Sequence, residues 1–395
     1  MQVYLDNSAT TKPYAEVVDL MAENMRSNFG NPSSLHNLGL SAEKAIKKAR
    51  TQIAGLMKVS EREIFFTSGG TEANNAAIIG AAISRKKEGN KIITTKIEHP
   101  SVLEVMKKLE KEGFDVVMLD VDESGLISLH ELEKQIDSQT VLISVMAVNN
   151  EIGTMQPIED IAKLKEEYNK KHGKRIIFHS DFVQALGKVE LPKAKVDITC
   201  VSGHKIHAAK GTGAIYIRNG ISLAPFVLGG GQEFGYRSGT ENVPGIAGFG
   251  KAAEIAGRDM ESRLERIEKA RERLLLGIEK NIENININGA KTKSKFFEAG
   301  KSVPAIVNVS FEGVRAEVLL HTLEQSDIYI STGSACSSHS KQKSHVLSAI
   351  GASDKEIESA VRFSFSEFNS EEEIDFTVEK LSEAVDKIRK LGSFR

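Results

Sequence analysis

Lys205 lies in a short polar turn between two apolar, β-type runs of the sequence. The run "VDITCV" precedes it, "GTGAIYIR" follows it, and His204 and His207 flank it. A lysine at the end of a buried strand can form a Schiff base with an aldehyde cofactor such as pyridoxal phosphate. Because a single lysine is more often a solvated surface residue, this interpretation needs further groups at the same place.

A carboxylate and an amide follow another β-type run, in "IIFHSDFVQALG". Asp181 stands at the strand end, where an aspartate taken alone is more commonly a helix N-cap. The alternative is an acid that keeps the cofactor's ring nitrogen protonated. Gln184 lies three residues further on and faces the same way if a helical turn begins there.

A glycine turn offers a phosphate site in "FFTSGGTEANN", which reads as strand, turn and helix start. The free N–H groups of Gly70 and Thr71, together with the helix dipole, would favour a phosphate. The alternative is a plain turn capped by Ser68 or Thr71. The segment is neither a Walker A loop nor a dinucleotide fingerprint. With Ser202 and His204 as further phosphate donors, these groups together favour a pyridoxal phosphate site around Lys205.

The elements that must position these groups alternate between short apolar runs and helical patterns. Helices are predicted over 71–87 and 100–112, between runs such as "EIFFTSG", "NKIITTK" and "TVLISVMAV". This alternation predicts a mostly parallel, doubly wound α/β sheet, in which ligands bind at the carboxyl ends of the strands. After about Val243 the pattern changes to one long helical stretch, over 243–280, and then to a smaller α+β domain.

The composition is that of an ordinary globular protein, with 395 residues, 40% hydrophobic, 27% charged and a net charge of -2. It gives no reason to expect nucleic acid or a membrane surface as a partner. No apolar run approaches the ~20 residues that span a bilayer. Two cysteines and no signal-like N-terminus indicate a reducing cytoplasm rather than a disulfide framework. The "HKIH" segment lacks the partners of a zinc site, so no metal is expected.

Ten stretches in order resemble the cysteine desulfurases, pyridoxal-phosphate enzymes of the class-V aminotransferase family that take sulfur from L-cysteine. They are "YLDNSATT", "FGNPSSLHNLG", "FTSGGTEANN", "EHPSVL", "VNNEIGTMQPI", "HSDFVQALGK", "SGHKIHAAKGTGAIY", "RSGTENVPG", "STGSACSS" and "VRFSFSEFNSEEEID". The short "GSACSS" loop is similar to the branch that serves nitrogenase and iron–sulfur assembly. The resemblance implies fold type I, with a large cofactor-binding domain over 15–258 and a small domain over 1–14 plus 259–395.

The resemblance also implies a role for each motif residue. Lys205 would carry the cofactor, Asp181 would bind the pyridine nitrogen and Gln184 the ring hydroxyl. His99 would stack on the ring and act as an acid or base, and Asn150 would lie near cofactor and substrate. The remaining assignments are phosphate contacts from Gly70, Thr71, Ser202 and His204, a cofactor contact from Thr240 of a second subunit, the substrate carboxylate on Arg362, and the sulfur on Cys336.

The two cysteines have different surroundings. Cys200, inside "DITCVS", fits the usual small buried hydrophobe. Cys336 lies among Ser, Thr, Gly and Ala without apolar periodicity, which is typical of an accessible loop with a reactive thiol. The implied activity converts L-cysteine to L-alanine and leaves a persulfide on Cys336. A homodimer would then pass this sulfur to an iron–sulfur scaffold or another acceptor.

Three positions depart from the family pattern. Phe234 and Glu367 stand where arginines are usual, and Ser366 stands where glycine is usual. We expect these positions near the active-site face, where two lost positive charges would weaken substrate or acceptor binding. They keep other readings open: a related lyase acting on selenocysteine, or a non-catalytic paralogue that serves as an assembly scaffold. An aminotransferase is disfavoured because it has no need for a mobile loop cysteine.

Overall fold

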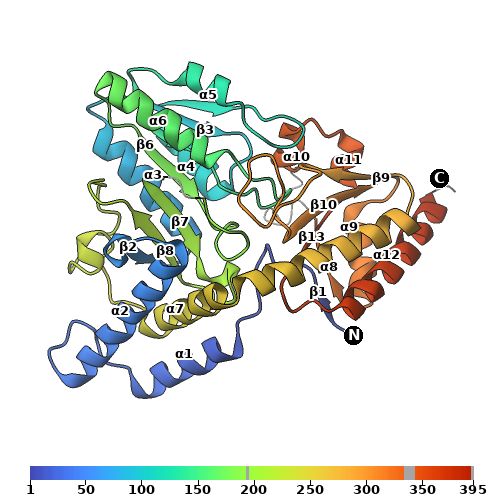
Figure 1. Ribbon diagram of the computed structural model, residues 1–395, viewed down its shortest axis with the longest axis horizontal. Coiled ribbons are helices and arrows are strands. Elements are labelled where there is room, and N and C mark those ends of the chain that lie inside the picture. Colours follow the sequence, from blue (N-terminus) through green and yellow to red (C-terminus); the bar gives the residue numbers. More distant parts are fainter. Residues whose placement is uncertain (193–194, 333–342, 393–395) are drawn as a thin grey trace.

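The computed structural model describes residues 1–192, 195–332 and 343–392. A seven-stranded sheet and a four-stranded sheet lie side by side, and a long helix runs from one toward the other (Figure 1). In this described part of the chain, no helix is both long and apolar enough to cross a membrane.

The seven-stranded sheet has the strand order β2-β8-β7-β6-β5-β3-β4. All neighbouring pairs are parallel except those of β8, which runs antiparallel to β2 and β7. This confirms the predicted mostly parallel sheet. Its strands are β2 (Ile64–Thr67), β3 (Lys91–Thr95), β4 (Asp115–Leu119), β5 (Thr140–Ser144), β6 (Ile177–Asp181), β7 (Ile198–Ser202) and β8 (Gly213–Ile217).

Helices cover both faces of this sheet, which explains why its central strands are apolar at successive positions. Ile92, Leu142 and Ile177 pack with α3 (Gly70–Arg85) and α4 (Pro100–Lys111). The next residue of each strand packs on the other face. That face is covered by α2 (Asn37–Met57), α6 (Ile158–His172) and α7 (Val243–Arg258), with α5 (Leu129–Gln135) and α1 (Ala15–Ser27) further out.

The four-stranded sheet is antiparallel, in the order β12-β13-β10-β9. Its strands are β9 (Ile285–Asn288), β10 (Ile306–Phe311), β12 (Ser331–Thr332) and β13 (Ala360–Ser364). A two-stranded parallel pair joins β1 (Val3–Tyr4) to β11 (Ile328–Tyr329). The helices of this part are α8 (Met260–Asn281), α9 (Ala316–Glu324), α10 (His345–Ala349), α11 (Asp354–Glu358) and α12 (Glu371–Gly392).

The single helical stretch expected over 243–280 is wrong. The chain forms α7 and α8, and Asp259 between them has φ -112° and ψ 23°, outside the helical region. The break lets α7 pack on α1 and α2 while α8 packs on α12, as Figure 1 shows. At the start of α12, Ser370 Oγ accepts the backbone N–H of Glu373 at 3.2 Å, which is a helix N-cap contact.

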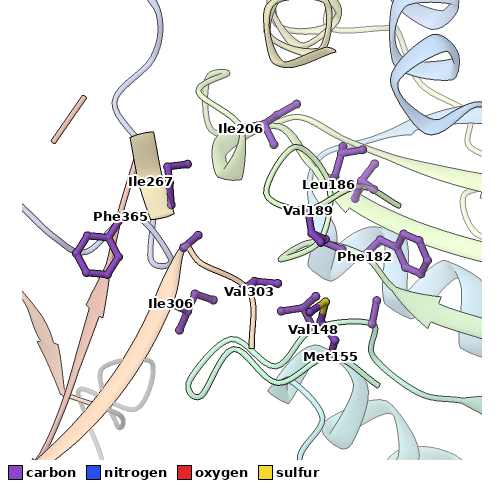
Figure 2. Close-up of a cluster of buried hydrophobic side chains, with 14 of the residues drawn as sticks. Val148, Met155, Phe182, Leu186, Val189, Ile206, Ile267, Val303, Ile306 and Phe365 are labelled. Atoms are coloured by element: carbon purple, nitrogen blue, oxygen red, sulfur yellow. The ribbon is translucent and has the colours of Figure 1, made fainter. Parts of the chain in front are cut away.

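Apolar side chains join the two sheets into one core (Figure 2). Loops that follow strands of the large sheet bring Val148, Phe182 and Ile206 into this cluster. The other part contributes Ile267 of α8 and Ile306 of β10. All of these side chains are at most 5% exposed. The shared core therefore holds the carboxyl ends of the parallel strands against the four-stranded sheet.

Candidate active site

A cavity of about 250 Å³ lies at the carboxyl ends of the central strands. Of the site residues predicted from the sequence, those that the structure describes all line it except Thr240. The lining comes from both sheets, because Arg362 belongs to β13 while Asp181 and Ser202 end β6 and β7. This is the place where a doubly wound sheet binds its ligand.

The Lys205 turn is held by the N-terminal segment of the chain. A 3-10 turn, Gly203–Lys205, follows β7 directly. Lys205 Nζ donates to the carbonyl oxygens of Ser8, at 2.5 Å, and Ala9, at 2.7 Å. Thr11 donates to the His204 carbonyl oxygen from both its backbone N–H, at 3.0 Å, and its hydroxyl, at 2.9 Å. The amine is therefore fixed in the cavity by contacts that a local sequence pattern cannot reveal.

Asp181 is buried, and its contacts are compatible with both roles considered from the sequence. Its Oδ1 accepts the backbone N–H of Val183 at 2.8 Å, as a capping aspartate does. Its Oδ2 accepts from Asn74 Nδ2 at 2.7 Å, and the side chain faces the cavity. Donors at both oxygens fix the orientation of this side chain, which is placed to meet a neighbouring ring nitrogen in the cavity.

Asn74 and Ser101 were missed in the sequence, although both lie inside quoted motifs. Asn74 Nδ2 also donates to Ser101 Oγ, at 2.9 Å, and Ser101 Oγ lies 2.8 Å from His99 Nδ1. These contacts make one buried chain from His99 to Asp181. The signal was the first asparagine of "TEANN", which faces inward from the first turns of α3.

His99 caps α4, and its Nδ1 accepts the backbone N–H of Ser101 at 3.1 Å. Burial lowers the pKa of His99, the charge of Lys205 lowers it further, and Asp181 opposes both. The ring is therefore a neutral imidazole near neutral pH, with its proton on Nε2. That form can donate from Nε2 and can also take up a second proton.

Gln184 is oriented by a residue that the sequence did not single out. Lys188 Nζ donates to Gln184 Oε1 at 2.5 Å, and Gln184 Nε2 donates to the Ser8 carbonyl oxygen at 3.0 Å. Burial lowers the pKa of Lys188 well below its usual range, and the charges of Lys205 and Arg362 add to this. The amide therefore presents its N–H side toward the cavity.

The start of α3 fits a phosphate. Gly69 is the N-cap and has no side-chain cap, while Ser68 Oγ donates to Glu72 at 2.5 Å instead. The alternative of a turn capped by Ser68 or Thr71 is therefore wrong, and backbone N–H groups are left for a ligand. Ser202 Oγ is buried and has no partner among the described residues. A Cβ on Gly70 would lie 2.9 Å from Val183 Cγ2, so only glycine fits there.

His204 adds a neutral donor to this end of the cavity. Burial lowers its pKa to about 4, and the charges of Lys205 and Lys188 contribute. Its Nδ1 lies 3.1 Å from Thr10 Oγ1. Near neutral pH the ring therefore contributes a hydrogen bond rather than a charge.

Arg362 lines the cavity from the side of the four-stranded sheet, on β13. Its Nη2 donates to Asp6 Oδ1 at 2.8 Å, and its Nη1 donates to the Asn150 carbonyl oxygen at 3.0 Å. Its Nε is buried and lacks a partner within the described residues. The guanidinium is thus oriented by two contacts and keeps a donor for a carboxylate.

Two predicted residues are not placed with the others. Thr240 is exposed and does not line the cavity of its own chain. Cys336 lies outside the described residues. Cys200 is fully buried, as expected, with its Sγ 3.4 Å from His179 Nε2, and burial raises its pKa well above the usual value.

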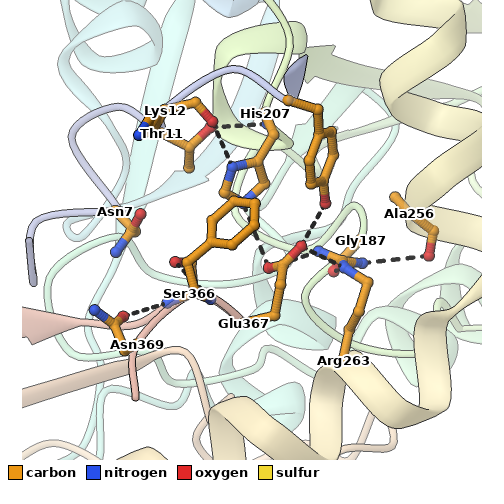
Figure 3. Close-up of polar contacts among 12 residues, drawn as sticks. Asn7, Thr11, Lys12, Gly187, His207, Ala256, Arg263, Ser366, Glu367 and Asn369 are labelled. Carbon is orange, nitrogen blue, oxygen red and sulfur yellow. Dashed lines mark hydrogen bonds and ion pairs between the residues drawn. The ribbon is translucent and has the colours of Figure 1, made fainter. Parts of the chain in front are cut away.

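The expectation that Phe234, Ser366 and Glu367 lie at the active-site face is wrong for this cavity, which none of them lines. Phe234 is 75% exposed and contacts the ring of Phe65 edge to face, at 5.9 Å between centroids. Ser366 is buried and the Glu367 side chain is 6% exposed, because the chain leaves β13 and packs beside α8 (Figure 3). Glu367 pairs there with Arg263 rather than facing a substrate.

The fold and the site together define a class: a doubly wound α/β protein with a polar cavity at the carboxyl ends of its parallel strands. The family model for class-V aminotransferases matches residues 3–376. The curated cysteine desulfurase IscS of Clostridium botulinum (strain Hall) is 43% identical over 99% of this chain and 96% of its own length. That of Methanosarcina thermophila is 43% identical over 99% of this chain and 93% of its own.

Solved structures agree with these relatives. A NifS-like protein has a TM-score of 0.88 and 39% identity, covering 98% of this chain and all of its own. The structure titled SspA in complex with cysteine has a TM-score of 0.81 and 34% identity, covering 93% of this chain and all of its own. The chain therefore belongs to the class-V aminotransferase family, within its cysteine desulfurases.

Proposed function

We propose that this desulfurase takes sulfur from L-cysteine with pyridoxal phosphate bound at Lys205, releases L-alanine and carries the sulfur on Cys336. The observation that carries this is a single cavity lined by Lys205, Asp181 and Arg362. It offers an amine, an acid and a carboxylate receptor.

The cofactor would be held by groups that have donors or acceptors to spare. Its phosphate would take the N–H groups of Gly70 and Thr71, the Ser202 hydroxyl, His204, and Thr240 of a second subunit. Asp181 would hold a proton on the ring nitrogen, and Gln184 would donate to the ring hydroxyl. When bound, the cofactor supplies an electron-accepting ring for the carbon that loses its proton.

The reaction then assigns one task to each side chain. Arg362 binds the substrate carboxylate, and Asn150 lies beside it. The Lys205 amine would remove the α-proton of the bound substrate. His99, a neutral imidazole, holds or accepts a proton over the ring. The shared core of Figure 2 holds the large sheet, whose strand β7 leads into Lys205, against the small sheet, whose strand β13 carries Arg362.

Cys336 takes the sulfur in the last step. Its thiolate attacks the substrate sulfur, so a sulfur–sulfur bond forms and the carbon–sulfur bond breaks. The electron pair of the broken bond stays with carbon, which takes up a proton and leaves as alanine. The persulfide then passes to an acceptor such as an iron–sulfur scaffold protein.

We also propose a homodimer in which Thr240 completes the partner's phosphate site. Apolar side chains that a single chain leaves exposed support it: Phe29, Leu35, Leu228 and Phe234. Mixing Lys205→Ala with Thr240→Val subunits tests this, because one mixed dimer contains one intact site. Activity recovered on mixing supports the shared site, and none recovered contradicts it.

The domain division at residues 15–258 against 1–14 plus 259–395, and a cytoplasmic location, stay predictions. The first agrees with the break at Asp259 between α7 and α8, after which the chain builds the smaller sheet.

Incubation of the purified protein with L-cysteine tests the function directly. We expect equal amounts of alanine and transferable sulfur, and a Cys336 peptide heavier by one sulfur atom. Cys336→Ala should abolish turnover, whereas Cys200→Ala, at the buried cysteine, should keep it. Full alanine production by Cys336→Ala would contradict the persulfide route, and turnover of selenocysteine alone would favour the related lyase. A colourless protein that binds no pyridoxal phosphate would favour the scaffold.

A further inference from the structure

A buried charged cluster lies next to the Lys205 turn, outside the cavity (Figure 3). Glu367 Oε1 accepts from Arg263 Nε at 2.7 Å and from the Tyr14 hydroxyl at 2.5 Å. Its Oε2 lies 3.5 Å from His207 Nε2. The side chains of Glu367, Arg263 and His207 are 6%, 5% and 4% exposed. A cluster this well shielded from water is sensitive to the loss of any member.

His207 joins this cluster to the N-terminal segment. Its Nδ1 lies 2.7 Å from the Lys12 carbonyl oxygen, which can only accept, so Nδ1 carries a proton. Its backbone N–H donates to Thr11 Oγ1 at 2.8 Å, and its carbonyl oxygen accepts from the Tyr14 N–H at 3.1 Å. Both ring nitrogens therefore face oxygen acceptors, Nδ1 the Lys12 carbonyl oxygen and Nε2 the Glu367 carboxylate.

The backbone of His207 needs this support. Its φ is 66°, in the left-handed region that residues other than glycine rarely adopt. His207 follows Lys205 by two positions, so a change in this backbone moves the lysine turn. Tyr14 stacks on the imidazole, with 4.6 Å between ring centroids, and Phe368 meets it edge to face at 5.2 Å.

The same segment holds the catalytic amine. Ser8 and Ala9 accept from Lys205 Nζ, and Thr11 binds the His204 carbonyl oxygen. The segment of residues 8–14 is thus hydrogen-bonded to Lys205 near its first residue and to His207 near its last. Glu367, which follows strand β13 and therefore Arg362, contacts His207 and Arg263. Arg263 in turn donates to the carbonyl oxygens of Gly187 and Ala256 at 3.4 and 3.3 Å.

We propose that Glu367 is a positioning residue for Lys205, acting through His207 and the segment Ser8 to Tyr14. Through the cluster, Glu367 connects the segment after β13, the strand that carries Arg362, to the turn that carries Lys205. Burial alone would raise the pKa of Glu367, but hydrogen bonds from His207 and Arg263 outweigh it and hold the pKa well below its usual range. The carboxylate therefore stays charged throughout the working pH range.

The test compares pyridoxal phosphate affinity with thermal stability, measured by absorbance titration of the apoprotein and by its melting temperature. His207→Asn keeps a residue that tolerates the left-handed backbone and leaves the Arg263–Glu367 pair intact. We expect it to weaken cofactor binding by about ten-fold, with a small change in melting temperature. The control is His321→Asn, at an exposed histidine whose Nδ1 lies 3.0 Å from Glu324 Oε2, and it should change neither.

The charge-swapped variant Arg263→Glu/Glu367→Arg separates positioning from simple stability. It restores an ion pair between α8 and residue 367 but turns a cation toward His207. We expect a higher melting temperature than for Glu367→Arg alone, with cofactor affinity still reduced. Full recovery of affinity by the swapped variant, or unchanged affinity in His207→Asn, would overturn the positioning role.

Should either variant fail to fold, Glu367→Gln, which keeps the shape and loses only the charge, decides by the same titration. A weakened affinity supports the role and an unchanged one overturns it. The inference rests on the proposed function, yet the two fail differently. A native protein that binds no pyridoxal phosphate removes the proposed function, whereas a native protein that binds it and variants that bind it equally well remove only the role of Glu367.

Discussion

Asn74 Nδ2 lies 2.7 Å from Asp181 Oδ2 and 2.9 Å from Ser101 Oγ, so one amide links the acid of the site to the partner of its histidine. Both contacts are buried. The orientation of Asp181 and of His99 is therefore a property of α3, on which Asn74 lies, as much as of the strands that carry the catalytic groups.

Asn74→Ala should lower kcat/KM for L-cysteine about ten-fold. The loss of a donor to a buried carboxylate costs about 1.5 kcal/mol, and Asp181 would hold a ring proton less well in a changed position. Steady-state kinetics with L-cysteine measure this. The matched control is Asn75→Ala, whose amide binds backbone oxygens of Thr71 and Ser101. A similar loss in both variants would mean that α3, not Asp181, is affected.

Lys188→Met should leave stability nearly unchanged and reduce activity. Nζ has no carboxylate within ion-pair distance among the described residues, so an apolar side chain of similar size replaces a costly buried amine. Activity should fall because Gln184 Oε1 loses the hydrogen bond from Lys188 Nζ. The Gln184 amide is then no longer held with its N–H side toward the ring hydroxyl of the cofactor. Urea unfolding and kinetics on the same preparation separate the two effects.

The control for Lys188 is Lys165→Met, at a lysine that is also buried but binds Asp197 at 2.8 Å. Removing one partner of that buried pair should cost about 3 kcal/mol of unfolding free energy. If Lys188→Met proved equally destabilising with normal activity in the folded fraction, Lys188 would be a structural residue only.

Arg362→Lys should raise the KM for L-cysteine on the order of a hundred-fold with a smaller change in kcat. Lysine keeps the charge but loses the planar fork that contacts Asp6 and the Asn150 carbonyl oxygen while offering Nε to a carboxylate. Arg273→Lys, in an exposed pair with Asp375, is the matched control and should behave as native. A fall in kcat at unchanged KM would argue against carboxylate binding.

Glu98→Gln should stabilise the protein increasingly as the pH rises from about 5 to 8. Burial raises the pKa of Glu98 to about 8, and the nearby Asp181 adds to this against hydrogen bonds from Met146 and Thr95. The folded state thus keeps a proton that the unfolded chain loses near its ordinary pKa. Native stability is full below that ordinary value and declines as the pH rises through about 8.

The expected slope of this decline is at most about 1.4 kcal/mol per pH unit. Urea unfolding of the native protein and of Glu98→Gln at a series of pH values measures it. Parallel curves would show that Glu98 is ionised in the folded state. Glu131→Gln, at an exposed carboxylate on α5, serves as the control for a change of charge alone.

Local patterns in the sequence determined much of this protein. Apolar runs fixed the central strands, because strands buried on both faces need apolar residues at successive positions. The glycine turn before α3 and the polar residues at strand ends indicated Gly70, Asp181 and Lys205, which line one cavity in the structure. These signals work because strand ends and helix starts are built from neighbouring residues, whose spacing is visible in the chain itself.

Only the tertiary structure decided which distant groups meet. Asn74 reaches Asp181 across 107 positions, and Glu367 reaches Tyr14 across 353. The sequence also placed Glu367 at the active-site face, whereas the chain turns away after β13 and buries it beside Arg263. Hydrogen bonds and ion pairs between remote segments follow from how the two sheets pack on their shared core, and no local periodicity encodes that packing.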